Sequence, residues 1–118
     1  MQDKINNNSY DDNNIFAKIL RKELPCNVVY EDEFVLAFHD IYPQAPIHIL
    51  VIPKDKYISF NDFIGSSANI TYFFSIVKKI THKFQLDKTG YRIVTNHGKQ
   101  GGQVIPHFHV HILGGKQL

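Results

Sequence analysis

Three histidines that alternate with apolar residues near the C-terminus constrain this chain more than any other feature. His107, His109 and His111 occupy every second position of the stretch 107–113. Successive side chains of an extended strand point to opposite faces, so the three imidazoles would share one face and the apolar side chains the other. The pattern predicts a strand with a core on one side and chemistry on the other.

The residues just before the histidines suggest what that chemistry is. The stretch 98–102 contains three glycines, which let a backbone bend sharply and turn its amides toward an anion. Glycines followed by imidazoles suggest a phosphate site. A metal site and a plain polar surface remain open, because imidazole is a common ligand of zinc and copper. Cys26 is the only cysteine, and no Cys-x-x-Cys or His-Glu-x-x-His accompanies the histidines to complete a metal site.

Composition limits the other classes of function. A chain of 118 residues with 43% hydrophobic content fits one globular domain, which we place at 15–118. A net charge of +2 gives no basis for binding nucleic acid or a charged membrane surface. Residues 1–14 are rich in asparagine and aspartate and predict a disordered N-terminal arm without a signal peptide. No apolar run reaches membrane-spanning length, and the expected location is cytoplasmic.

The order of predicted elements favours an α+β fold. Helices are expected at 15–24, where Pro25 ends the pattern, and from Ser66 or Ser67 to about Phe84. Between them, 54–65 is predicted to be a loop. Because the strands do not alternate with helices, we expect an antiparallel sheet of about five strands with two helices packed on one face. The expected strands are 28–30, 34–38, 48–52, 91–95 and the histidine stretch.

Two polar residues at strand ends stand out beside the histidines. Asp40 follows a strand, where its carboxylate could either accept hydrogen bonds from a ribose or cap the next turn. The residues alone support these two roles equally. His48 begins a strongly apolar strand, so its imidazole needs a partner or a function.

Several motifs resemble those of a known family and occur in the same order along the chain. The run His107-Phe108-His109-Val110-His111-Ile112-Leu113 matches the signature of the histidine-triad superfamily. Asn96 with Gly101-Gly102-Gln103 resembles its lead-in. The segments 38–41, 43–46, His48 with 51–54, and 114–115 resemble the Hint branch in particular. The resemblance covers about residues 15 to 115 and implies the histidine-triad type of α+β fold, with the sheet extended across a homodimer.

The resemblance also implies an activity and assigns roles to residues. The chain would bind purine nucleotides and act at the α-phosphorus of nucleoside phosphoramidates or related nucleoside monophosphate esters, releasing AMP or GMP without a metal or cofactor. His109 would be the nucleophile, held through Nδ1 by a backbone carbonyl so that Nε2 is free. His107 and His48 would orient the site, and His111 with the backbone amides of 102–104 would hold the phosphoryl oxygens. The remaining nucleotide contacts implied are Asp40, Ile41, Asn96, Gly102, Gln103, Val104, Phe16 and Ile19.

One position departs from that family pattern. Val104 stands where eukaryotic Hint proteins often carry a serine, so only its backbone amide is available. The chain also has a short tail after Gly115, which bears on substrate choice. A nucleotide-binding scaffold with slow residual turnover is the alternative function, and a metal-binding sensor is a more distant one.

Overall fold

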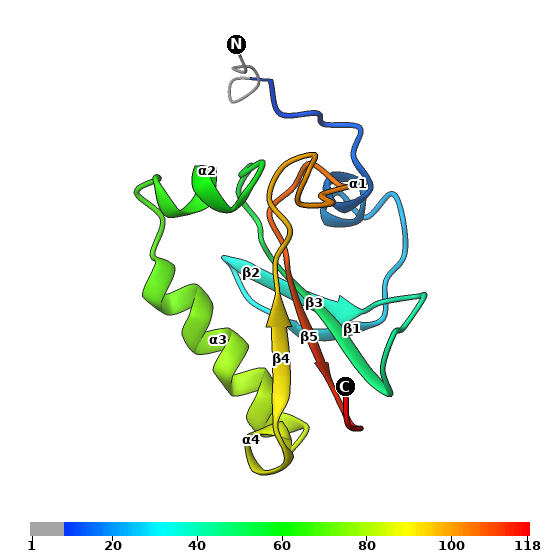
Figure 1. Cartoon of the computed structure of the whole chain (residues 1–118). Coiled ribbons are helices and arrows are strands. Elements are labelled where there is room, and N and C mark those ends of the chain that lie inside the picture. Colours follow the sequence, from blue (N-terminus) through cyan, green and yellow to red (C-terminus); the bar gives the residue numbers. More distant parts are fainter. Residues whose placement is uncertain (1–8) are drawn as a thin grey trace.

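The computed structural model describes residues 9–118 and shows a five-stranded antiparallel sheet (Figure 1). The strand order is β1-β2-β3-β5-β4, so the last strand in sequence lies between β3 and β4. The predicted α+β class and the antiparallel sheet are confirmed. The strands are β1 Val28–Glu31, β2 Val35–His39, β3 Ile47–Pro53, β4 Tyr91–Val94 and β5 Val110–Gly114.

The helices of the described chain are α1 Ile15–Leu20, α2 Phe60–Ile64, α3 Ile70–Lys83 and α4 Leu86–Thr89. The two short helices, α2 and α4, were not predicted. Helix α2 forms inside the expected loop because Ser59 Oγ accepts a hydrogen bond from the Asp62 N–H and so caps the first turn. No helix within residues 9–118 combines the length and the apolar character needed to cross a membrane.

The ends of the two predicted helices needed correction. Helix α1 ends at Leu20, because Lys22 has a φ of 65° in the left-handed region, well before Pro25. Helix α3 begins at Ile70 rather than at Ser66 or Ser67. Its cap is Asn69, whose side-chain oxygen accepts the Tyr72 N–H at 2.9 Å.

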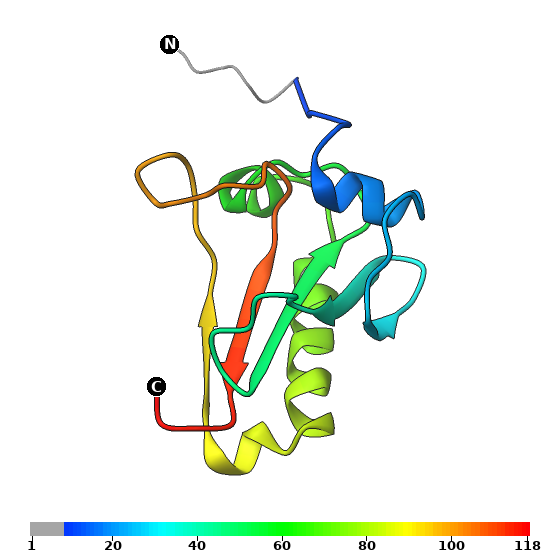
Figure 2. The same ribbon diagram turned by 90° about the vertical axis from the view of Figure 1, so that its right-hand side faces the viewer.

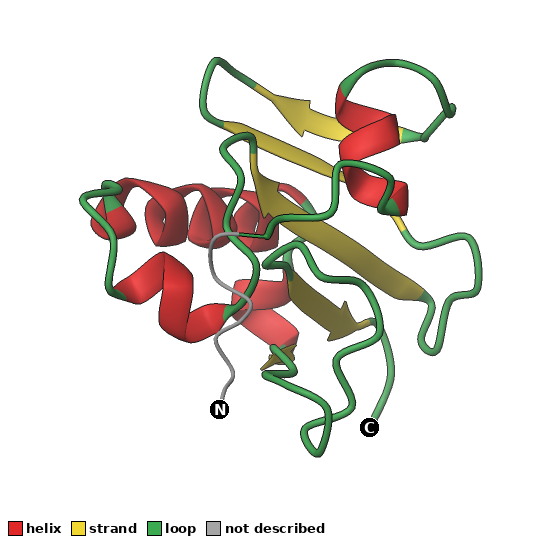
Figure 3. Cartoon of the chain, turned by 90° about the horizontal axis from the view of Figure 1, so that it is seen from above, coloured by secondary structure: helices red, strands yellow, loops and turns green. Residues whose placement is uncertain are grey.

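Helices cover both faces of the sheet, and the prediction that they pack on one face was wrong (Figures 2 and 3). Strand β2 is buried at four successive positions, so neighbouring side chains enter opposite cores. Ala37 and Ile49 pack in the core shared with α3. Leu36 and Leu50 pack on the other face with Phe16 of α1.

Residues 9–14, which were predicted to belong to a disordered arm, contact the rest of the domain. The first eight residues of the predicted 1–14 arm lie outside the described residues. Asn14 is buried, and its side-chain oxygen accepts the Ala17 N–H at 2.9 Å, which caps α1. Tyr10 reaches the ring of His107. The end of this segment therefore belongs to the packed structure.

Candidate functional site

The histidine stretch keeps its predicted alternation, although only part of it is a strand. Strand β5 begins at Val110, so His107 and His109 precede it. The Phe108 N–H donates to Tyr57 O at 2.7 Å instead of pairing with β3. Phe108 lies in the α3 core, whereas His107 and His109 face α1, with exposed fractions of 0% and 7%. The imidazoles therefore share the face that α1 covers.

The hydrogen bond of His109 fixes its tautomer. Nδ1 lies 2.7 Å from the backbone oxygen of His107, and a carbonyl can only accept, so Nδ1 carries the proton. Burial lowers the pKa of His109 below its ordinary value, which favours the neutral ring. Within residues 9–118 the ring makes no other hydrogen bond, and Phe16 packs edge-on against it at 4.9 Å. His109 thus presents a neutral Nε2 that no described residue occupies, which is the arrangement that the family resemblance implies.

His107 is held on both sides of its ring. Nε2 lies 2.8 Å from the backbone oxygen of Pro53, so it donates, and in a neutral ring Nδ1 must then accept. The donor to Nδ1 is the Tyr10 hydroxyl. Burial lowers the pKa of His107 to about 4, so the ring is neutral at pH 7. Both ring nitrogens of His107 are therefore occupied by hydrogen bonds within the protein.

A second chain of hydrogen bonds orients His111. The Gln44 N–H donates to Nδ1 of His48 at 3.0 Å, so the neutral ring of His48 carries its proton on Nε2. That Nε2 lies 2.9 Å from Nδ1 of His111, which therefore accepts and leaves the His111 proton on its own Nε2. Burial lowers the pKa of His48, and burial with the nearby histidines lowers that of His111 to about 4. His111 is thereby set as a neutral N–H donor beside His109, with ring centroids 5.1 Å apart.

Asp40 caps the turn after β2, as one of its two predicted roles, and its second carboxylate oxygen faces His48. Oδ1 accepts the Tyr42 N–H at 2.8 Å, which caps the turn after β2. Oδ2 lies 3.4 Å from Nε2 of His48. Asp40, His48 and His111 offer ligand atoms within 4.8 Å of one another, so they could share a cation. The Gln44 bond opposes this, because it leaves a proton on the His48 nitrogen that would have to bind the metal.

The glycine loop is closed on itself, which changes the role of Gln103. Its side-chain oxygen accepts the Gly98 N–H at 2.9 Å, and its amide nitrogen donates to Ile58 O and Ile105 O. The backbone N–H groups of Gly102 and Gln103 donate to Lys99 O and Gly98 O. These two amides and the Gln103 side chain were predicted to bind phosphate or ribose. In this structure they shape the loop instead.

Gly98 and Gly102 have φ values of 73° and 82°, in the region that favours glycine, whereas Gly101 is required for a steric reason. A Cβ at this position would lie 2.2 Å from the His97 carbonyl oxygen. The loop is therefore compact because the backbone passes over itself. At Gly101 the lack of a side chain therefore serves contact with the protein's own backbone.

The other predicted contacts differ in how far they are exposed. Val104 is 88% exposed, and its N–H has no hydrogen-bond acceptor within residues 9–118, so it is the amide of 102–104 that remains for an anion. Ile41 is 79% exposed. Ile19 packs at the border of the α1 core, and Asn96 is half-buried. The exposure of these positions therefore ranges from partly buried to almost fully exposed.

A pocket of about 370 Å³ lies elsewhere, on the α3 side of the sheet. Phe34, Lys54 and Tyr72 are among its lining residues, and no histidine is. The Tyr72 hydroxyl donates to Asp32, so its proton is already used within the protein. The grouped imidazoles, not this pocket, are the candidate active site.

Sequence reasoning missed three groups that hold the histidines. Two are backbone atoms, the Pro53 oxygen and the Gln44 N–H, which no side-chain pattern can reveal. The third is Tyr10, which lies in the segment predicted to be disordered. The available signal was that Tyr10 is the one aromatic residue of 1–14.

Comparison with known proteins gives the family. The family description "HIT domain" matches residues 21–118. The chain belongs to the HIT-domain family. It is 51% identical to an uncharacterized HIT-like protein of Rickettsia prowazekii over 92% of both chains. It is also 46% identical to a protein named 14 kDa zinc-binding protein of Zea mays, over 92% of this chain and 86% of that one.

Solved HIT structures share the fold. A HIT family hydrolase from Legionella pneumophila superimposes with a TM-score of 0.83 at 42% identity, over 89% of this chain and 95% of that one. A histidine triad nucleotide-binding protein from Candida albicans gives a TM-score of 0.71 at 30% identity, over 84% and 72%. The fold is thus that of HIT family hydrolases.

Proposed function

We propose that this protein is a nucleotide-binding hydrolase or transferase of the Hint type. Its substrates would be purine nucleoside phosphoramidates or related nucleoside monophosphate esters, attacked at the α-phosphorus to release AMP or GMP. The observation that carries the proposal is the state of His109, whose Nδ1 is bound to the His107 carbonyl while Nε2 is free. The names of the Legionella and Candida proteins support a hydrolase and a nucleotide ligand.

The first step would form a nucleotidyl-histidine. His109 Nε2 uses its lone pair to form a bond to the α-phosphorus, and the leaving amine departs with the electrons of the P–N bond and takes a proton from solvent. His111 would donate its Nε2 proton to a phosphoryl oxygen, and the Val104 N–H would donate to another as charge builds there. Water would then add to phosphorus and lose a proton to solvent, while the P–Nε2 bond breaks and its electrons return to neutral His109. The Oδ2 oxygen of Asp40, which lies 3.4 Å from His48 Nε2, would receive the ribose.

The test is to incubate the pure protein with an adenosine phosphoramidate, with and without a chelator, and follow AMP by mass spectrometry. Release that a chelator leaves unchanged supports the hydrolase. Binding without release would favour the nucleotide-binding scaffold. Release that the chelator abolishes would favour a metal at Asp40, His48 and His111, against the tautomer that the Gln44 bond imposes.

We also propose a homodimer that extends the sheet through β4. This strand ends the sheet and exposes apolar side chains, with Tyr91 at 41% and Ile93 at 45%. Stable dimers commonly bury roughly 1,200 Å² or more in total.

Ile93→Lys is expected to shift the protein from dimer to monomer in light scattering at micromolar concentration. Val28→Lys is the matched control, because Val28 is 49% exposed on the opposite edge strand, and it should stay dimeric. A wild-type protein that is monomeric under these conditions would refute the dimer.

Val104→Ser is expected to raise turnover of phosphoramidates with poor amine leaving groups. A hydroxyl at this position could donate to the bridging atom of the departing group, and a net hydrogen bond of about 0.5–1.5 kcal/mol corresponds to roughly two- to tenfold in rate. Since Val104 is 88% exposed, the change removes little packing within the chain. Steady-state rates for a series of aryl and alkyl phosphoramidates measure the gain, with Val104→Ala as control. Equal rates for the serine and alanine variants would show that residue 104 does not face the leaving group.

A further inference from the structure

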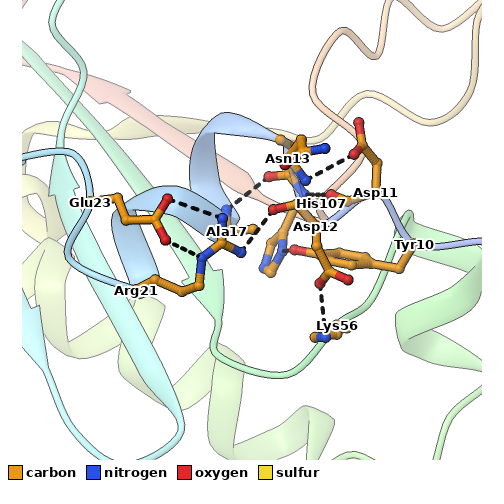
Figure 4. A network of polar contacts seen from close by, with 10 residues as sticks. Tyr10, Asp11, Asp12, Asn13, Ala17, Arg21, Glu23, Lys56 and His107 are labelled. Carbon is orange, nitrogen blue, oxygen red and sulfur yellow. Dashed lines mark hydrogen bonds and ion pairs between the residues drawn. The ribbon is translucent and has the colours of Figure 1, made fainter.

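The N-terminal segment contacts the first triad histidine, His107, at the ring nitrogen opposite to the one that bonds Pro53 of β3. The Tyr10 hydroxyl is 2.5 Å from Nδ1 of His107, and the two rings meet edge-on with centroids 5.6 Å apart (Figure 4). His107 has no exposed surface in this arrangement. A residue 97 positions earlier in the sequence thus completes the surroundings of the first triad histidine.

Contacts made by the residues that follow Tyr10 hold this segment in place. Asp12 forms an ion pair with Lys56 at 2.8 Å, and its backbone oxygen accepts from Arg21 at 2.8 Å. The Lys56 ammonium also lies 5.8 Å from the centre of the Tyr10 ring. Asn14 donates from its side chain to Asp11 O at 2.7 Å. The position of Tyr10 is therefore set by several contacts. Figure 4 shows those of Asp12 with Lys56 and Arg21 beside Tyr10 and His107.

The direction of the Tyr10 hydrogen bond follows from the rest of the His107 ring. Because Nε2 donates to the Pro53 carbonyl, a neutral ring can only accept at Nδ1, and Tyr10 must donate. Burial raises the pKa of Tyr10 above its ordinary value, so the hydroxyl keeps its proton at neutral pH. Loss of this donor would leave a buried nitrogen without a partner, which is costly.

His107 in turn determines the state of His109. The backbone oxygen of His107 accepts the Nδ1 proton of His109 at 2.7 Å, and this bond leaves Nε2 free. Movement of residue 107 would move that oxygen. Tyr10 is thus connected to His109 through one residue, because its hydroxyl binds the His107 ring and the His107 carbonyl binds Nδ1 of His109.

We propose that Tyr10 is a positioning residue of the triad, whose hydroxyl fixes His107 and, through the His107 carbonyl, the orientation of His109. Tyr10 touches neither substrate nor the reacting atoms, so it acts only through His107. Its effect on turnover rests on the proposed function of His109. Its effect on the state of the His107 ring does not.

The kinetic test compares Tyr10→Phe with wild type on an adenosine phosphoramidate. The variant keeps the ring and removes only the hydroxyl, and kcat is expected to fall about two- to tenfold while KM changes little. Lys56→Met is the matched control, because it removes the Asp12 ion pair and the cation over the Tyr10 ring but leaves the hydroxyl. It should keep the wild-type kcat. An equal fall in both variants would mean that only the attachment of the segment matters, and would overturn the proposal.

Nitrogen NMR of the imidazoles tests the same idea without turnover. In wild type, His107 should show a protonated Nε2 and a hydrogen-bonded, unprotonated Nδ1, with the His107→Gln variant identifying its signals. Tyr10→Phe should shift the Nδ1 signal toward that of a free unprotonated nitrogen, and Lys56→Met should not. A protonated Nδ1 in wild type, or an unchanged Nδ1 signal in Tyr10→Phe, would overturn the proposal. If wild type releases no AMP, the proposed function fails while this measurement still decides the role of Tyr10.

Discussion

Replacing His109 by alanine is expected to lower turnover of an adenosine phosphoramidate by roughly 10³-fold or more, since no other group can take over a missing nucleophile. Nε2 of His109 is the triad nitrogen that is both unprotonated and free of a partner within residues 9–118. His111 presents a proton instead, and His107 has both ring nitrogens occupied. AMP binding should largely survive, because the nucleophile is one contact among several.

A second substitution at this position separates chemistry from packing. His109 is only 7% exposed, so alanine leaves a gap beside Phe16. His109→Asn retains an N–H that can donate to the His107 carbonyl but has no lone pair at Nε2. It should lose turnover to the same extent with a smaller loss of stability.

Quenched-reaction mass spectrometry checks both variants. The nucleotidyl adduct should form on wild type and on His82→Ala, an exposed histidine outside the triad, and on neither His109 variant. Calorimetry with AMP verifies that the site remains folded. An adduct that persists in the His109 variants would assign the nucleophile to another residue.

The sequence predicted the histidine face because that information is local. Alternation at His107, His109 and His111 requires only extended backbone, and it holds even where β5 has not yet begun. The same holds for the hairpin of β1 and β2, where apolar runs flank a charged turn. Periodicity is sufficient for such features.

Residues that depend on distant backbone could not be predicted in the same way. The sequence assigned Gln103 to a ligand, but its side chain is used by the amide of Gly98 and by two carbonyls. Tyr10 was placed in a disordered arm because its neighbours are polar. Its partner, His107, is 97 positions away, so composition alone could not pair them.

The predicted packing on one face failed for a related reason. Strand β2 is apolar at successive positions, which is the pattern of a strand buried on both faces. That pattern was visible in the sequence. The helix that covers the second face, α1, is only six residues long, and its short apolar stripe did not indicate which side it would take.

Acid should destabilise this protein through its buried neutral histidines, with His107 the clearest case. In the unfolded chain a histidine binds its proton near its ordinary pKa of 6.5, whereas burial lowers the pKa of His107 in the folded protein to about 4. Between these two pH values the unfolded state holds more protons, so the free energy of unfolding falls as the pH falls. The contribution of His107 is fully present above pH 6.5 and is lost progressively down to about pH 4. The stability lost relative to neutral pH is about 2 kcal/mol at pH 5 and up to about 3 kcal/mol over the whole window.

His107→Gln tests this contribution, because glutamine cannot take up a proton yet keeps an N–H that can donate to the Pro53 carbonyl. Urea unfolding at pH 7 and pH 5 gives the drop in stability for each protein. The variant is expected to be less stable than wild type at pH 7, since it loses the Tyr10 partner, but its drop on acidification should be about 2 kcal/mol smaller. His82→Gln removes an exposed histidine and should keep the wild-type drop. If His107→Gln lost as much stability between pH 7 and pH 5 as wild type does, the acid sensitivity would have to come from His48, His109 or His111 instead.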